Sequence, residues 1–343
     1  MLGRNHILRS IPVILMGLGL FLGGSATRAS AAERARFLLD WIPYGKHAPF
    51  YVGVDKGIYK KYGLNVTVLA GKGSGLSIKT VGAKGVEFAF ADAGSLILAR
   101  ANSPSLRAKL ITMLHHNSLF NVVTLAKSGI NSPKDLEGKK IGSPAVNSSK
   151  IVFPAFAEAA GLDPKKVIWV DMEVAVQHPS LFAEKIDAIV SYVTQVPPLK
   201  LMAKKVGKPI KSMLYADYGL DLYSNGIIAH EDTIRNRAAY TRAFVLASLA
   251  AVQWSVENPK EAMTVFLSHH PNTNRKIARG QFDVSVDVLL TKNTARTGIG
   301  FMLPEKMQNT IDLMARFHKQ MKRKPSPEEI YTNEFVGFFP KRR

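Results

Sequence analysis

The chain has 343 residues, of which 46% are hydrophobic and 21% are charged. This composition is typical of a globular protein and excludes a disordered, collagen-like or coiled-coil chain. At about 150 residues per domain, the length suggests about two domains. Cysteine is absent, which excludes a disulfide framework, a thiol nucleophile, thiolate zinc sites and iron–sulfur clusters. The net charge is +20, so an anionic partner such as nucleic acid has to be considered.

The first 31 residues have the pattern of a secretory signal peptide. Arg4 and Arg9 precede an apolar stretch over residues 11–24, and Ala29 and Ala31 form an A-x-A cleavage site. A membrane-spanning helix needs about 20 residues, so a cleaved signal fits better than an uncleaved anchor. Export argues against a nucleic-acid partner. Because no cysteine is present to carry a lipid anchor, we expect a free protein in the bacterial periplasm.

Apolar runs alternate with helical patterns along the rest of the chain. Strands are predicted at residues 35–42, 64–70, 86–91, 110–114, 121–126, 139–143, 167–170, 188–192 and 224–229. Helices are predicted at residues 47–56, 76–83, 96–101, 133–136, from 148 or 149 to 160, at 238–257, and over most of the chain from there to 323. Pro197 and Pro198 are expected to break the chain after a strand. The alternation predicts two α/β units, each a parallel sheet with helices on both faces, the second inserted into the first.

Ligands of open α/β sheets lie beyond the carboxyl ends of the strands. Trp41, Tyr44 and His47 follow the first predicted strand, where aromatic faces can hold a flat ligand or a cation. The alternatives are core packing for Trp41, a surface position for Tyr44 and a helix cap for His47.

Other candidates follow later strands. Gly73 and Ser74 can form a backbone cradle for a ligand oxygen or a plain turn, and their surroundings do not match the GxGxxG dinucleotide pattern. Asp92, followed by Ala93, can hold a ligand amino group or cap a helix. Tyr192 ends a strand at the expected cleft.

Three further features have weaker signals. Asp217 and Tyr218 precede the returning strand, where a hinge is expected. Adjacent histidines occur at 115–116 and 269–270, but neighbours on a strand point to opposite faces, so no metal site is predicted. The basic residues near 319–324 and 341–343 are expected to form a solvated face or a loose contact with anionic lipid.

Several motifs together resemble one family. They are FLLDWIPYGKHAPFYVGVDKGIYKKYGLNVTV, FAFADAGSLILARA, SPKDLEGKKIGSP, DYGLDLYSNGIIA and YTNEF, and they span residues from about 35 to 335. The chain resembles the substrate-binding proteins of ABC importers of the thiamine-pyrimidine-precursor type, whose relatives bind sulfonates, taurine and nitrate or are yeast-type pyrimidine synthases.

The resemblance implies a type II periplasmic-binding-protein fold, with two α/β lobes, a ligand cleft between them and a hinge. It implies that Trp41 and His47 match ligand-facing positions, with Ser74, Asp92 and the loop of Asn147 and Ser148 near them. Thiamine-precursor binders typically have Asn where this chain has Tyr44, a departure that allows another flat or anionic ligand. The cysteine-rich motif of the synthases is absent.

The sequence therefore predicts a non-enzymatic periplasmic solute-binding protein that delivers a small organic nutrient to an ABC permease in the inner membrane. The lead ligand is a thiamine pyrimidine precursor or a similar heteroaromatic. The alternatives are an anion such as a sulfonate or aromatic carboxylate, a pyrimidine-synthase-like enzyme, or a basic protein that binds a surface or nucleic acid. We expect a monomer without cofactor or metal. The expected lobes are residues 32–122 with 226–343, and residues 123–225.

Overall fold

The computed structural model describes residues 32–336, so the predicted signal peptide at 1–31 and the basic end at 341–343 lie outside the described residues.

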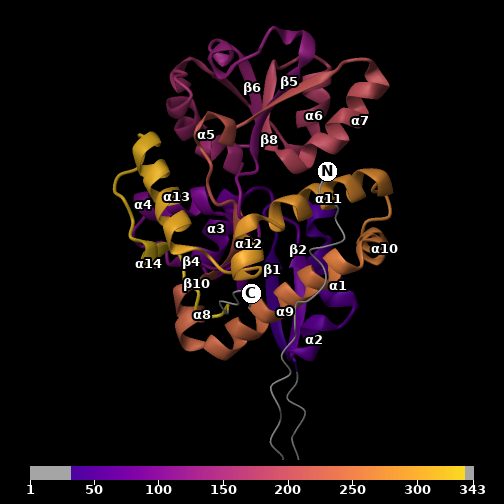
Figure 1. Ribbon diagram of the computed structural model, residues 1–343, viewed down its shortest axis with the longest axis vertical. Coiled ribbons are helices and arrows are strands. Elements are labelled where there is room, and N and C mark those ends of the chain that lie inside the picture. The colour runs from indigo at the N-terminus through magenta and orange to yellow at the C-terminus, as the bar shows by residue number, and fades with distance from the viewer. Residues whose placement is uncertain (1–31, 337–343) are drawn as a thin grey trace, which may run out of the picture.

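Two five-stranded sheets lie one above the other along the long axis of the molecule (Figure 1). The first sheet has the order β2-β1-β3-β10-β4, and the second sheet has the order β7-β6-β8-β5-β9. The strands of the first sheet are β1 (Glu33–Leu38), β2 (Leu64–Leu69), β3 (Phe88–Asp92), β4 (Ala108–Met113) and β10 (Asn225–His230). Those of the second sheet are β5 (Phe120–Leu125), β6 (Lys140–Ser143), β7 (Ile168–Asp171), β8 (Ala188–Tyr192) and β9 (Ile210–Leu214).

Helices connect the strands and make up most of the chain after β10. Between the strands lie α1 (Ala48–Asp55), α2 (Ile58–Lys61), α3 (Ser74–Gly82), α4 (Ala93–Asn102), α5 (Ser148–Ala159), α6 (Val174–Phe182) and α7 (Val196–Val206). After β10 follow α8 (Glu231–Asn236), α9 (Ala238–Glu257), α10 (Pro259–His269), α11 (Arg275–Leu289), α12 (Lys292–Thr297), α13 (Pro304–Phe317) and α14 (Pro327–Ile330). Short 3₁₀ turns that bear on the site are η1 (Gly45–His47), η5 (Val193–Gln195) and η6 (Ala216–Tyr218).

The mixed α/β architecture agrees with the prediction, but the sheets are not purely parallel. In the first sheet β10 runs antiparallel to both β3 and β4, and in the second sheet β5 runs antiparallel to both β8 and β9. Each reversed strand follows directly on a segment that crosses from one sheet to the other. Two parallel neighbouring strands need a crossover connection, usually a helix, between them. The segments that lead into β5 and β10 contain no such helix.

The expected chain break at Pro197 and Pro198 is wrong. Both prolines lie in the first turn of α7, which begins at Val196. In that turn the backbone N–H groups have no partner within the helix, so a missing N–H costs nothing and the fixed φ favours the helix. The sequence patterns also do not predict β9 or the helices α2, α6, α8 and α14.

Two segments, residues 114–119 and 215–224, connect the sheets and lie against each other. The backbone N–H of Ser224 donates to the carbonyl of His115 at 3.0 Å, and the N–H of His115 donates to the carbonyl of Asn225 at 3.0 Å. Strand β5 begins just after the first of these segments, at Phe120. The lobe limits expected near 122 and 226 fall close to the connecting segments, and the division into lobes stays a prediction.

An apolar core continues from one sheet to the other along one side of the molecule. Val152 and Phe156 of α5, Leu96 of α4 and Met314 of α13 belong to one cluster of fully buried side chains. Helix α5 follows a strand of the second sheet, whereas α4 and α13 pack beside the first sheet (Figure 1). Within residues 32–336, none of the helices is both long enough and apolar enough to cross a membrane.

Candidate ligand-binding site

A buried charged cluster lies just beyond the carboxyl end of β1. The strand ends at Leu38, four residues earlier than predicted, and this places Asp40 in the loop that follows it. One carboxylate oxygen of Asp40 accepts a hydrogen bond from Lys46 Nζ at 2.6 Å, and the other pairs with His47 Nε2 at 2.8 Å. All three side chains are at most 3% exposed.

The hydrogen bonds assign the protonation of His47. Its Nδ1 accepts from the backbone N–H of Tyr44 at 3.2 Å, so Nε2 carries the hydrogen that is donated to Asp40. Burial lowers the pKa of His47 to about 4 and outweighs the opposing effect of Asp40. His47 is therefore neutral at pH 7.

The charges of Lys46 and Asp40 cancel. Burial alone would raise the pKa of Asp40, but Lys46 and His47 outweigh it and hold that pKa well below its usual range. Burial alone would lower the pKa of Lys46. The nearby carboxylate of Asp40 opposes this effect, and the pKa of Lys46 is raised. Both groups stay ionised as a neutral pair.

Three aromatic rings surround the ammonium group of Lys46. Its Nζ lies 4.7 Å from the centre of the Tyr192 ring, 5.3 Å from that of Phe90 and 5.4 Å from that of Tyr44. These distances are within the range of cation–π attraction. Phe90 lies on β3 of the first sheet, whereas Tyr192 ends β8 of the second sheet. The cluster therefore sits where the two parts of the molecule meet.

Polar contacts join the two parts around this cluster. The hydroxyl of Tyr44 lies 2.9 Å from Thr194 Oγ1 in η5, and both residues are buried. Gln281 of α11 accepts from the backbone N–H of Gly45 at 3.1 Å and donates to Gln195 at 3.4 Å. A Cβ at Gly45 would lie 1.9 Å from the carbonyl oxygen of Ala278, so only glycine allows α11 to pack this closely.

Asp92 has one carboxylate oxygen without a partner. Its Oδ1 accepts from the backbone N–H and the hydroxyl of Ser95, at 2.7 and 3.0 Å, so Asp92 caps α4. Its Oδ2 is buried and has no hydrogen-bond partner among the residues that the structure describes. Burial raises the pKa of Asp92 to about 7. Above about pH 7 the ionised Oδ2 can accept a hydrogen bond, and below that pH the protonated carboxyl can donate one.

The loops around Ser74 and Asn147 meet between the sheets. Ser74 Oγ accepts from the backbone N–H of Asp92 at 3.1 Å. Gly73 has a φ of 134°, and a Cβ there would lie 2.3 Å from the carbonyl oxygen of Val146, so the glycine permits the close approach of the two loops. Asn147 caps α5 by accepting from Ser149 N at 2.8 Å.

Other candidate residues take different positions. Ser148 Oγ lies 2.6 Å from the hydroxyl of Tyr192, beside the cluster. Ala93 is buried at the start of α4, where its N–H donates to the carbonyl of Ser224 at 2.9 Å. Trp41 is half-buried and follows Asp40 directly.

Asp217 and Tyr218 are not part of the cluster. Asp217 is exposed in η6. Tyr218 packs edge-on against Phe156 of α5, with 5.8 Å between ring centres. Both residues lie in the second connecting segment, 215–224, whereas Asn225, which follows this segment, contacts Asp40 of the cluster.

Sequence reasoning missed several residues that form the cluster. The sequence pattern predicts a strand at Asp40 and a loop at Lys46, and a lysine is rarely buried unless it is paired. Asn225, Thr194 and Gln281 carry no local pattern. Among residues 32–336, no group of three or more His, Asp or Glu is arranged to hold a metal ion, and the absence of a cofactor stays a prediction.

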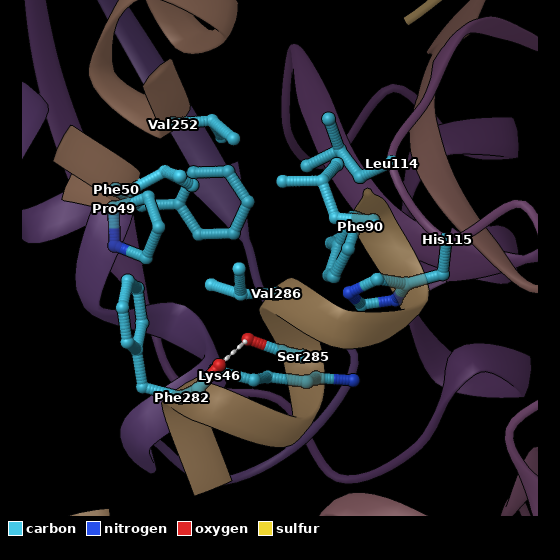
Figure 2. A pocket seen from close by; sticks show the side chains of 12 residues that line it. Lys46, Pro49, Phe50, Phe90, Leu114, His115, Val252, Phe282, Ser285 and Val286 are labelled. Atoms are coloured by element: carbon cyan, nitrogen blue, oxygen red, sulfur yellow. Dashed lines mark hydrogen bonds between the residues drawn. The ribbon is translucent and has the colours of Figure 1, made fainter. Parts of the chain in front are cut away.

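A small cavity of about 20 Å³ lies behind Lys46 in the part of the molecule that contains the first sheet. Figure 2 shows Phe50, Phe90, Leu114 and Val286 around it, with the chain of Lys46 and the ring of His115 at one side. Its volume is enough for about one water molecule. A ligand of the size of a nucleobase would not fit in this cavity.

Comparisons with known proteins agree with this architecture. The chain is 27% identical over 292 residues to the formylaminopyrimidine-binding protein of Halalkalibacterium halodurans, covering 83% of this chain and 87% of that one. It is 25% identical over 312 residues to the riboflavin-binding protein RibY of Chloroflexus aurantiacus, covering 89% and 86%. A yeast 4-amino-5-hydroxymethyl-2-methylpyrimidine phosphate synthase is 23% identical over 264 residues, covering 74% and 76%.

Solved structures show the same fold. The alkanesulfonate-binding protein SsuA of Xanthomonas axonopodis pv. citri bound to MOPS superposes with a TM-score of 0.67 at 11% identity, covering 88% of this chain and 100% of that one. The ligand-binding component of an ABC-type import system from Staphylococcus aureus gives a TM-score of 0.65 at 10% identity, covering 88% and 97%. The periplasmic-binding-protein fold expected from the sequence is confirmed. The family model described as NMT1/THI5 like matches residues 45–262, and the chain belongs to this family.

Proposed function

We propose that the protein captures a small organic molecule between its two sheets, without altering it, and delivers it to the permease of an ABC importer in the bacterial periplasm. The division into two lobes at the connecting segments is part of this proposal. Formylaminopyrimidine- and riboflavin-binding relatives and the fold of import-system binding components support it. A ligand shifts such a protein from its open to its closed state only to the extent that it binds the closed state more tightly.

One observation carries the proposal, namely the buried polar cluster at the junction of the two sheets. Lys46, Tyr44 and Asp92 come from the first sheet and its loops, and Tyr192 comes from the second sheet. Polar groups are buried at a cost unless they are paired. An acceptor such as Asp92 Oδ2, which has no partner in the described chain, is therefore suited to a ligand.

The chemistry of the cluster favours a neutral, flat molecule that donates N–H bonds. Lys46 is neutralised by Asp40, so the site offers no net positive charge to an anion. Above about pH 7 the ionised Asp92 Oδ2 accepts from a donor. The rings of Tyr44 and Tyr192 offer apolar faces to a planar ring. Because the Lys46–Asp40 pair is neutral, it contributes nothing to the net charge of +20.

A thermal-unfolding screen of the protein without residues 1–31 tests the proposal. The probes are formylaminopyrimidine, riboflavin and MOPS. A bound probe at 100 times its dissociation constant stabilises the folded state by about 2.7 kcal/mol. We expect stabilisation by formylaminopyrimidine or riboflavin and little by MOPS. Stabilisation by MOPS alone would contradict the ligand class, and conversion of a probe into a product would contradict the binding function.

Variants connect a positive result to the cluster. Asp92→Asn keeps the size of the side chain and replaces the acceptor Oδ2 by a group that can be a donor. At pH 8, where Asp92 is ionised, the affinity for the hit should fall about tenfold or more. Asp171→Asn, at an exposed carboxylate on β7, is the matched control and should leave the affinity unchanged. Equal affinity of both variants and the wild type would remove Asp92 from the site.

A further inference from the structure

Asn225 occupies a junction between the binding cluster and the segments that connect the sheets. It is the first residue of β10, directly after the connecting segment 215–224, and it is fully buried. In the first sheet it lies opposite Asp92 of β3. Asn225 therefore adjoins both a segment that connects the sheets and the proposed binding site.

The side chain of Asn225 contacts the central carboxylate of the cluster. Its Nδ2 donates to Asp40 Oδ2 at 3.0 Å, the same oxygen that accepts from Lys46. Its Oδ1 accepts from the hydroxyl of Ser224 at 3.1 Å. This second bond fixes the orientation of the amide, so that the nitrogen faces Asp40.

The backbone of Asn225 holds both connecting segments. Its carbonyl oxygen accepts from the N–H groups of Leu114 and His115, at 3.1 and 3.0 Å, and the preceding N–H, of Ser224, donates to the carbonyl of His115 at 3.0 Å. Any change in the separation of the sheets must bend these segments, since they link β4 to β5 and β9 to β10.

We infer that Asn225 is a positioning residue that couples the state of the Asp40–Lys46 pair to the bending of the two connecting segments. The inference rests on the proposed function, because the pair lies in the proposed ligand site. A buried carboxylate is most stable when every donor around it is in place. When the segments bend, the backbone of Asn225 shifts and the donor at Asp40 moves with it. By linkage, a ligand that changes the cluster also changes the preferred bend.

The substitution Asn225→Asp tests this coupling because it keeps the shape and makes the donor dependent on pH. The titratable groups around position 225 are Asp40, Lys46 and His47 on the loop after β1, Asp92 on β3 and His115 on the adjoining segment. An ionised carboxylate at 225 would repel Asp40, whereas a protonated one can donate to it. Each comparison is made against the wild type at the same pH, because these groups also titrate in the wild type.

The experiment measures the separation of the sheets directly. Since the chain has no cysteine, the substitutions Lys60→Cys on α2 and Lys200→Cys on α7 provide two labelling sites, both exposed, for spin–spin distance measurement without any ligand. In N225D we expect longer and broader distances than in the wild type at pH 8, and recovery of the wild-type distribution at pH 5. The affinity for formylaminopyrimidine should fall about tenfold to a hundredfold at pH 8 and recover at pH 5.

Two control variants separate coupling from damage to the fold. Asn121→Asp changes another fully buried asparagine, one that donates to Ser212 Oγ at 2.8 Å in the second sheet, and it should leave the distances unchanged at both pH values.

Ser224→Ala removes the bond that orients the amide and should lengthen the distances slightly, which provides a test if N225D does not fold. Wild-type distances in N225D and S224A, or a lengthening in N225D that is the same at both pH values, would overturn the inference. If the wild type binds none of the probes, the proposed function fails, whereas the distances still test the coupling.

Discussion

The ammonium nitrogen of Lys46 lies 2.6 Å from the carboxylate of Asp40, and the two side chains are only 0% and 3% exposed. Neither charge can be left alone in this environment, because an unpaired buried charge loses its hydration without compensation. The pair is thus the fixed electrostatic centre around which Tyr44, Tyr192 and Asn225 are arranged.

Breaking this pair should destabilise the protein strongly. Lys46→Met leaves Asp40 buried without its cation, and we expect a loss of about 3–5 kcal/mol in the free energy of unfolding, measured by chemical denaturation. Adding Asp40→Asn should recover part of this loss. Lys84→Met is the matched control, because Lys84 pairs with Asp232 at 2.6 Å but is 62% exposed, and its loss should stay below about 1 kcal/mol. Equal losses in both lysine variants would contradict the role of burial.

The hydroxyl of Tyr44 should hold the two parts of the molecule together. Tyr44→Phe and Thr194→Val each remove the same 2.9 Å contact, so each should shift the equilibrium toward longer distances between the sheets by about two- to tenfold. The double variant should add little to either single one, since both act on one bond. Additive effects in the spin–spin distances would show that the two hydroxyls act separately.

Asp92 should make the folded state less stable as the pH rises. Its pKa is about 7 in the folded protein, against about 3.9 in an unfolded chain. Between these values the folded state binds the proton and the unfolded state does not, so stability falls by up to about 1.4 kcal/mol per pH unit. The Asp92→Asn variant has no titratable group at this position and therefore lacks this pH dependence of stability. Its stability relative to the wild type should therefore rise from pH 4 to pH 7 and level off above, as measured by denaturation at each pH. A constant difference would contradict the raised pKa.

His116 should act in the opposite direction. Both of its ring nitrogens lack a hydrogen-bond partner in the described chain, its ring packs edge-on against Tyr223 at 5.3 Å, and burial lowers its pKa to about 4. The unfolded histidine takes up a proton below about pH 6.5, so the wild type loses stability as the pH falls. His116→Phe keeps the ring and removes this loss. Measured against the wild type, the free energy of unfolding of the variant should be about 2 kcal/mol more favourable to the folded state at pH 5 than at pH 8. The same difference at both pH values would contradict the lowered pKa.

The strongly patterned elements could be predicted from the sequence. The strand at 188–192 and the helix at 238–257 have the predicted limits. The strand is a short, fully buried run, and the helix ends before Asn258 and Pro259. The reversed strands could not be predicted, since the direction of β5 and β10 depends on the connections between the sheets.

The site could be predicted only in part. The strand-end loops gave Tyr44, His47, Asp92 and Tyr192, which the structure brings together. Asp40 and Lys46 were missed because each is buried only through the other, a condition that no local pattern reports. Asp217 and Tyr218 are predicted at a hinge, and both lie in the connecting segment 215–224. They are not part of the cluster, and their place at a hinge stays a prediction.

The most direct test of the central claim is a crystal structure of the protein, without residues 1–31, in complex with the best probe of the thermal screen. We expect electron density for one molecule between the two sheets, with a donor group on Asp92 Oδ2 and a ring face against Tyr44 or Tyr192. Density confined to another surface, with the Asp40–Lys46 cluster still closed between the sheets, would contradict it.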